Sequence, residues 1–136
     1  MAKSESKSIL EASVESELID CCTLIDWECW KFVTPGRRGP PDRILLGSGG
    51  RVVFVELKTK GGRLFKWQKR NHKKLRALGF RVEVLWTKEQ VRAFVPSLVG
   101  SAAKRLVRRT SFSRATRRGQ SRQSDYITLA TAILRS

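Results

Sequence analysis

The sequence has few cysteines, a single histidine and no long apolar run. Its cysteines are Cys21, Cys22 and Cys29, and its histidine is His72. No set of these residues has zinc-ligand spacing, so the cysteines are interpreted as reduced core thiols on a helix. No segment has the length and hydropathy of a signal peptide or a membrane span. We therefore expect a protein of a reducing, cytoplasmic compartment that has no membrane partner.

Acidic residues are also scarce. The 136 residues include 12 Asp and Glu against 28 Lys and Arg, a formal net charge of +16. Such an excess favours a polyanionic partner, and nucleic acid is the most common one. Arginine suits this partner because its planar guanidinium can bind two phosphate oxygens at once. Composition does not, however, separate an enzyme from a basic binding protein.

The basic residues are densest near the C-terminus. Residues 100–136 contain nine Lys and Arg and one acid, Asp125, and their apolar periodicity is weak. Residues 1–99 are enough for one domain with a hydrophobic core. We assign a folded domain to residues 1–99 and a basic, poorly ordered extension to residues 100–136, in which 126–134 could form a short helix. The extension is either a solvated tail or an arm that contacts DNA.

The hydrophobic pattern of residues 1–99 alternates between helical and strand periods. It predicts an amphipathic helix, an extended segment, a hairpin with a glycine-rich turn, a basic helix, a third strand and a capped last helix. Because the third strand follows a helix, we expect it to pair in parallel through a crossover. The predicted fold class is an α/β sandwich. The expected elements are residues 5–25, 29–33, 42–46, 51–58, 65–78, 81–86, and a helix from 87 to 94 or 95.

The most apolar run, Val52–Val55, ends at Glu56, Leu57 and Lys58. Apolar residues on consecutive positions predict a strand that is buried on both faces. Side chains two positions apart share a face, so Glu56 and Lys58 should project together where this strand leaves the core. A buried ion is costly unless it is paired or bound to a metal. The pair is either a structural ion pair or part of a metal-dependent phosphodiesterase site.

Asp42 follows Pro40 and Pro41, which fix the backbone in an extended conformation. It is either a strand-initiating turn residue or a metal ligand. The hairpin register can bring Asp42 to the same end as Glu56, and a cation between two carboxylates removes their repulsion. Mg²⁺ prefers oxygen ligands, so both carboxylates, the Leu57 carbonyl and water would suffice.

Polar residues of the two longer helices are further candidates. Gln68 lies on a helical stripe that should face the sheet, where its amide could hold a water or a phosphate oxygen. In the first helix, Glu15 lies on the stripe that faces the edge of the core and could complete the metal site through water. Glu17 and Glu11 remain alternatives for this position.

Basic residues adjoin the candidate site on both sides. The sequence predicts phosphate contacts from the glycine-containing loop before Asp42 and from the basic helix. Trp67 could stack on a base or pack against the protein, whereas His72 is interpreted as an ordinary helix residue. Three tryptophans are expected in the core or at its edge, namely Trp27, Trp30 and Trp86. The predicted DNA contacts are Arg37, Arg38, Lys66, Lys69 and Arg70.

Three segments together resemble the VRR-NUC family, a branch of the PD-(D/E)XK nuclease superfamily. They are Pro35–Arg43 (PGRRGPPDR), Val53–Lys58 (VFVELK) and Gln68. The resemblance covers about residues 8–95. Pro40-Pro41 and Thr59-Lys60 depart from the family pattern, but neither departure removes a ligand.

The resemblance implies a restriction-endonuclease-like core, with a mixed β-sheet flanked by α-helices. It places the metal-binding acids of the family at Asp42 and Glu56, its lysine at Lys58, its glutamine at Gln68 and its N-terminal helix glutamate at Glu15. The implied cofactor is Mg²⁺ or Mn²⁺, and no small-molecule cofactor is expected.

The same resemblance implies a metal-dependent DNA endonuclease of the small, stand-alone bacteriophage and prophage type. Such an enzyme would cut branched DNA, for example a Holliday junction, as a homodimer in the cytoplasm of a bacterial or phage-infected cell. Two alternatives remain. One is a non-catalytic basic module that binds DNA or RNA, and the other is a nuclease directed at RNA.

Overall fold

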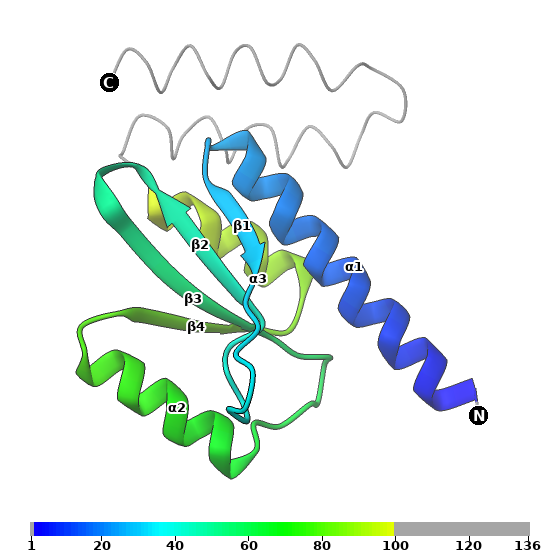
Figure 1. Ribbon diagram of the computed structural model, residues 1–136. Helices are drawn as coiled ribbons and strands as arrows, with labels where there is room; N and C mark the ends of the chain where they lie inside the picture. The colour runs from blue at the N-terminus through cyan, green and yellow to red at the C-terminus, as the bar shows by residue number, and fades with distance from the viewer. Residues whose placement is uncertain (1, 100–136) are drawn as a thin grey trace, which may run out of the picture.

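A four-stranded sheet with helices on both faces forms the centre of the protein (Figure 1). The computed structural model describes residues 2–99. The predictions for residues 100–136, including the helix at 126–134, fall outside the described residues. The strands lie side by side in chain order: β1 (Glu28–Lys31), β2 (Arg43–Gly47), β3 (Arg51–Leu57) and β4 (Arg81–Leu85).

The sheet is mixed, as the sequence predicts. β1, β2 and β3 are antiparallel neighbours, and β2 and β3 form a hairpin through the glycine-rich turn at Ser48–Gly50. β4 pairs in parallel with β3 after the crossover through helix α2 (Lys66–Ala77). Arg43 pairs with Val55 in the hairpin, and this register places Asp42 beside Glu56.

The side chains of β3 alternate between two buried faces. Val53, Val55 and Leu57 belong to the main hydrophobic core, together with residues of helix α1 (Ala2–Leu24) and helix α3 (Lys88–Phe94). Phe54 and Glu56 point to the other face of the sheet, which is covered by α2 and by the residues that directly follow β1 and precede β4. The consecutive apolar residues thus predicted burial on both faces correctly.

The helices begin and end near the predicted residues. Thr87 caps α3, because its hydroxyl accepts a hydrogen bond from the Gln90 N–H at 3.2 Å. Gly79, at φ +91°, follows α2. α1 starts earlier than predicted, and its N-terminal part extends beyond the sheet (Figure 1), which leaves Ile9 and Leu10 exposed. Within residues 2–99, no helix is long and apolar enough to cross a bilayer.

Three expectations about the core are wrong. Trp27 is buried, but Trp30 is 57% exposed because it lies on β1, at the open edge of the sheet. Cys21 and Cys22 are buried thiols on α1, as predicted, whereas Cys29 is half-buried on β1 rather than on a helix. The expected helical stripe also included Ile19, which is 36% exposed.

Candidate active site

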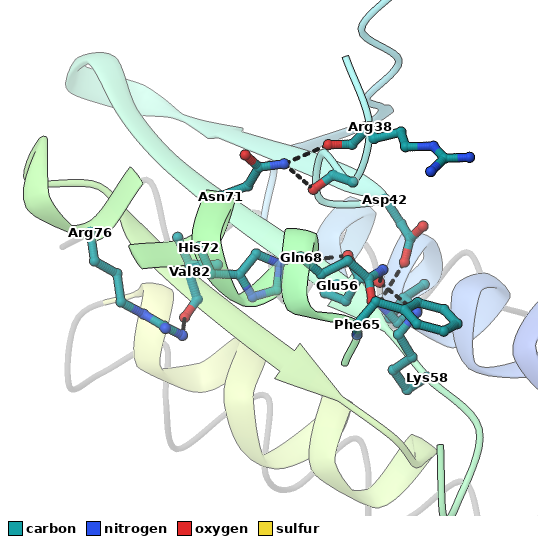
Figure 2. Close-up of polar contacts among 12 residues, drawn as sticks. Arg38, Asp42, Glu56, Lys58, Phe65, Gln68, Asn71, His72, Arg76 and Val82 are labelled. Atoms are coloured by element: carbon teal, nitrogen blue, oxygen red, sulfur yellow. Dashed lines mark hydrogen bonds and ion pairs between the residues drawn. The ribbon is translucent and has the colours of Figure 1, made fainter. Parts of the chain in front are cut away.

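Asp42 is held at the start of β2 by the end of β3. The Leu57 N–H donates a hydrogen bond of 2.8 Å to Asp42 Oδ2. The hairpin register and this bond place Asp42 next to Glu56, as the sequence predicts. The contact fixes the Asp42 carboxylate at the point where β3 leaves the core (Figure 2).

Glu56 is fully buried and has partners from two elements. Its Oε1 atom lies 2.7 Å from Lys58 Nζ and accepts a hydrogen bond of 2.5 Å from Gln68 Nε2. Gln68 is itself fixed, because its Oε1 accepts a hydrogen bond of 3.0 Å from the Phe65 N–H. The structure therefore brings the four predicted catalytic residues, including Asp42, to one place (Figure 2).

The second oxygen of Glu56 has no such partner. Glu56 Oε2 is buried and accepts no hydrogen bond, and both ring nitrogens of His72 are also buried without one. His72 Nε2 lies 3.6 Å from Glu56 Oε2, beyond a good hydrogen-bond distance. His72 is only 1% exposed, so it belongs to the surroundings of Glu56 rather than to an ordinary helix surface.

A cleft of about 270 Å³ lies between α1 and the end of β3, next to Asp42 and Lys58. Of the helix acids, Glu11 and Glu15 line this cleft, whereas Glu17 is buried elsewhere and pairs with Arg92 of α3 at 2.8 Å. Glu15 is engaged by Arg43, with 2.6 Å between Glu15 Oε1 and Arg43 Nη2. The remaining lining residues are Ala12, Asp42, Leu57 and Lys58.

The Asp42 carboxylate is electrostatically unfavourable in this site. Burial raises the pKa of Asp42 above its ordinary value, and the nearby Glu56 carboxylate raises it further. The hydrogen bond from the Leu57 N–H and the charge of Lys58 act in the opposite direction but do not outweigh burial. A bound cation would relieve both unfavourable contributions.

Basic residues are exposed on the two segments that contact the site, the loop before Asp42 and helix α2. Arg37 and Arg38 are exposed in the loop before Asp42, and Asn71 of α2 donates hydrogen bonds of 2.7 Å to the carbonyls of Arg38 and Gly39 (Figure 2). This contact of Asn71 could not be predicted from the sequence, because its partners are carbonyls far away in the chain. On α2, three predicted DNA contacts are exposed as well: Lys66, Lys69 and Arg70.

Comparisons with known proteins agree with this geometry. No protein-family model matches the chain. The curated protein "Putative nuclease p44" of Acyrthosiphon pisum secondary endosymbiont phage 1 is 43% identical over 77 residues, which cover 57% of this chain and 83% of that protein. A solved structure described as "VRR_NUC domain" matches with a TM-score of 0.60 and 26% identity, over 62% of this chain and 92% of that chain.

The chain belongs to the VRR-NUC family. The predicted fold class is thereby confirmed, since the mixed sheet flanked by helices is the PD-(D/E)XK-type core of this family.

The VRR-NUC site has the oxygen-rich chemistry of a site for a hard divalent cation. Glu56 Oε2 is an orphaned buried oxygen, and Asp42 is a partly buried carboxylate whose pKa is raised by burial and by the Glu56 charge. Within residues 2–99, no three His, Cys, Asp or Glu side chains form a metal site by themselves, so backbone oxygen or water would have to contribute. Glu56 does not line the cleft, and its Oε1 is already bound by Lys58 and Gln68, so the contacts around Glu56 would have to rearrange for an ion to bind it.

An Asp42→Asn substitution is expected to stabilise the metal-free protein slightly, by up to about 1 kcal/mol at neutral pH. A carboxyl with a raised folded-state pKa contributes most to stability below its unfolded pKa, and the contribution is lost as the pH rises through the folded pKa. The difference in unfolding free energy between variant and wild type, measured with urea in EDTA, should therefore grow from acid to neutral pH. A difference that is constant with pH would contradict the raised pKa of Asp42.

Proposed function

We propose that this VRR-NUC chain is a DNA endonuclease that hydrolyses phosphodiester bonds and depends on Mg²⁺ or Mn²⁺. The observation that supports it most is that Asp42 and Lys58 line one cleft, where the Lys58 amine also reaches the buried Glu56 carboxylate. Two desolvated carboxylates and an amine suit phosphodiester hydrolysis better than they suit a purely structural role.

Each site residue has a role in this proposal. Asp42, Glu56 and the Leu57 carbonyl would hold the ion, with Glu15 contributing directly or through water once it is released from Arg43. When bound, the ion would supply positive charge that activates water and the scissile phosphate. Lys58 would orient the attacking water and stabilise the charge that develops on the phosphate oxygens. Gln68 would keep Glu56 in position through its 2.5 Å hydrogen bond.

The exposed basic residues of the loop before Asp42 and of α2 would hold the DNA backbone. Arg37 and Arg38 lie in the loop that leads to Asp42, so they could bind phosphates next to the cut. Lys66, Lys69 and Arg70 present further exposed charge on α2. Family resemblance extends the proposal to branched DNA and to a homodimer, because a junction has two strands to cut and a two-fold dimer has two sites.

Metal removal tests the proposal. Purified protein is expected to cut a four-way junction, a flap, a duplex or a single strand in Mg²⁺ or Mn²⁺, and to cut none of them in EDTA. The ion should also raise the melting temperature of the wild type, by the equivalent of about 2.7 kcal/mol at 100 times its Kd. An Asp42→Asn variant should lose both responses and still bind DNA.

A non-catalytic binding module would give a different set of results. It would shift all DNA substrates and cut none of them with either ion, and its melting temperature would not respond to Mg²⁺ or Mn²⁺. Cutting that survives in Asp42→Asn would point to a contaminating nuclease. Light scattering of the protein alone and with a junction would decide the proposed dimer.

A further inference from the structure

Two aromatic side chains are exposed side by side at the start of α2. The rings of Phe65 and Trp67 are stacked, with their centroids 4.7 Å apart and their planes 11° from parallel. Phe65 is 56% exposed and Trp67 is 42% exposed. Large aromatic side chains in contact with one another at the surface indicate a binding site more often than single exposed apolar residues do.

The aromatic pair is fixed to the candidate active site. The Phe65 N–H donates to Gln68 Oε1, and Gln68 donates in turn to Glu56 Oε1. Figure 2 shows Phe65 at the same end of β3 as Asp42 and Lys58. The Arg38 guanidinium lies over the Trp67 ring, 5.5 Å from its centroid, so the loop before Asp42 borders the same surface.

The surrounding charge indicates what this surface would bind. Arg38, Lys66 and Lys69 are exposed next to the rings, and the whole chain carries a net charge of +16. A second copy of the chain would bring the same positive charge, which opposes self-association at this surface. A nucleobase suits it better, because it offers a flat face for stacking and is attached to phosphates that the basic side chains can neutralise.

We propose that Phe65 and Trp67 form a stacking platform for an unpaired nucleobase next to the scissile phosphate. The proposal rests on the proposed nuclease function and narrows its substrate class. In a continuous duplex each base is stacked between its neighbours, so its face is not available to the platform. A flap, a gap or a junction between single- and double-stranded DNA supplies such a base, and the protein should prefer these substrates to a fully paired duplex.

Binding measured in EDTA tests the platform without cleavage. The probes are fluorescein-labelled DNAs with equal numbers of phosphates, one with an unpaired arm and one fully paired. Phe65→Ala is expected to weaken binding of the unpaired arm about tenfold, the loss typical of one stacked base, and to change duplex binding less than about twofold. Phe65→Tyr should restore the affinity. Leu78→Ala is the matched control, because Leu78 is 73% exposed at the far end of α2.

Three results would overturn the platform. Equal losses for both DNAs would indicate a general contact, and no loss for either would show that the rings do not bind DNA. A change of the mass measured by light scattering in Phe65→Ala would assign the surface to a contact between copies. The two proposals can be refuted separately. A wild type that cuts no DNA refutes the nuclease function, whereas a selective loss of binding to the unpaired DNA in Phe65→Ala would still support the stacking platform.

Discussion

Replacing Lys58 with methionine is expected to lower the Mg²⁺-dependent cleavage rate by about 10³-fold. Lys58 is the cationic side chain at the cleft whose Nζ lies within 2.7 Å of buried Glu56. Methionine keeps most of the side-chain volume but removes the charge that would orient water and stabilise the transition state. Single-turnover cleavage at saturating protein measures this loss, and DNA affinity should change less than about threefold because one phosphate contact contributes modestly.

The Lys58 substitution also removes the cation nearest to Glu56, and this effect has to be separated from catalysis. Breaking a buried ion pair by removing one partner costs about 3–5 kcal/mol at most. Lys58→Arg retains a cation beside Glu56 but changes the position of its donors, so it should recover stability without recovering the rate. Lys60→Met is the control for charge, because Lys60 is exposed just beyond the site. Full activity in Lys58→Arg would show that only charge is needed there.

The central part of the site could be predicted from the sequence because it depends on local rules. The apolar run identified β3, and the two-residue separation of Glu56 and Lys58 indicated that they share a face. The short hairpin turn set the register that brings Asp42 next to Glu56. Helical spacing also placed Gln68 toward the sheet, where it contacts Glu56. Each of these steps needs only periodicity and one turn.

Contacts between distant segments could not be predicted in the same way. Arg43 pairs with Glu15 across 28 positions, and Asn71 binds the Arg38 and Gly39 carbonyls across more than 30. Helical spacing placed Glu15 at the edge of the core but gave no information on its partner. The burial of His72 was missed because a lone histidine in a basic helix gives no signal of burial, and Trp30 was misplaced because edge and central strands have similar sequences.

The loop that carries Arg38 fits against α2 only because residue 39 is glycine. Gly39 has a φ of +71°, and an added Cβ would overlap the Trp67 ring and lie 3.3 Å from the Gln68 backbone nitrogen. Gly39→Ala is therefore expected to lower the free energy of unfolding by about 1–3 kcal/mol more than a matched glycine substitution without a neighbour. It should also lower the cleavage rate about tenfold or more, because relief of the overlap displaces either the Asp42 loop or the start of α2.

Gly36→Ala is that matched substitution. Gly36 lies in the same loop with nearly the same φ, +73°, and an added Cβ would meet nothing within 4 Å. In both variants the positive φ costs an alanine about 1–2 kcal/mol, and the unfolded chain changes in the same way. The difference between their free energies of unfolding therefore isolates the contact with Trp67 and Gln68. Urea unfolding compares the stability of the two variants, and single-turnover cleavage compares their rates. Equal stability and equal cleavage would mean that the loop and α2 can separate freely, and the geometry of Asp42 would then not depend on their contact.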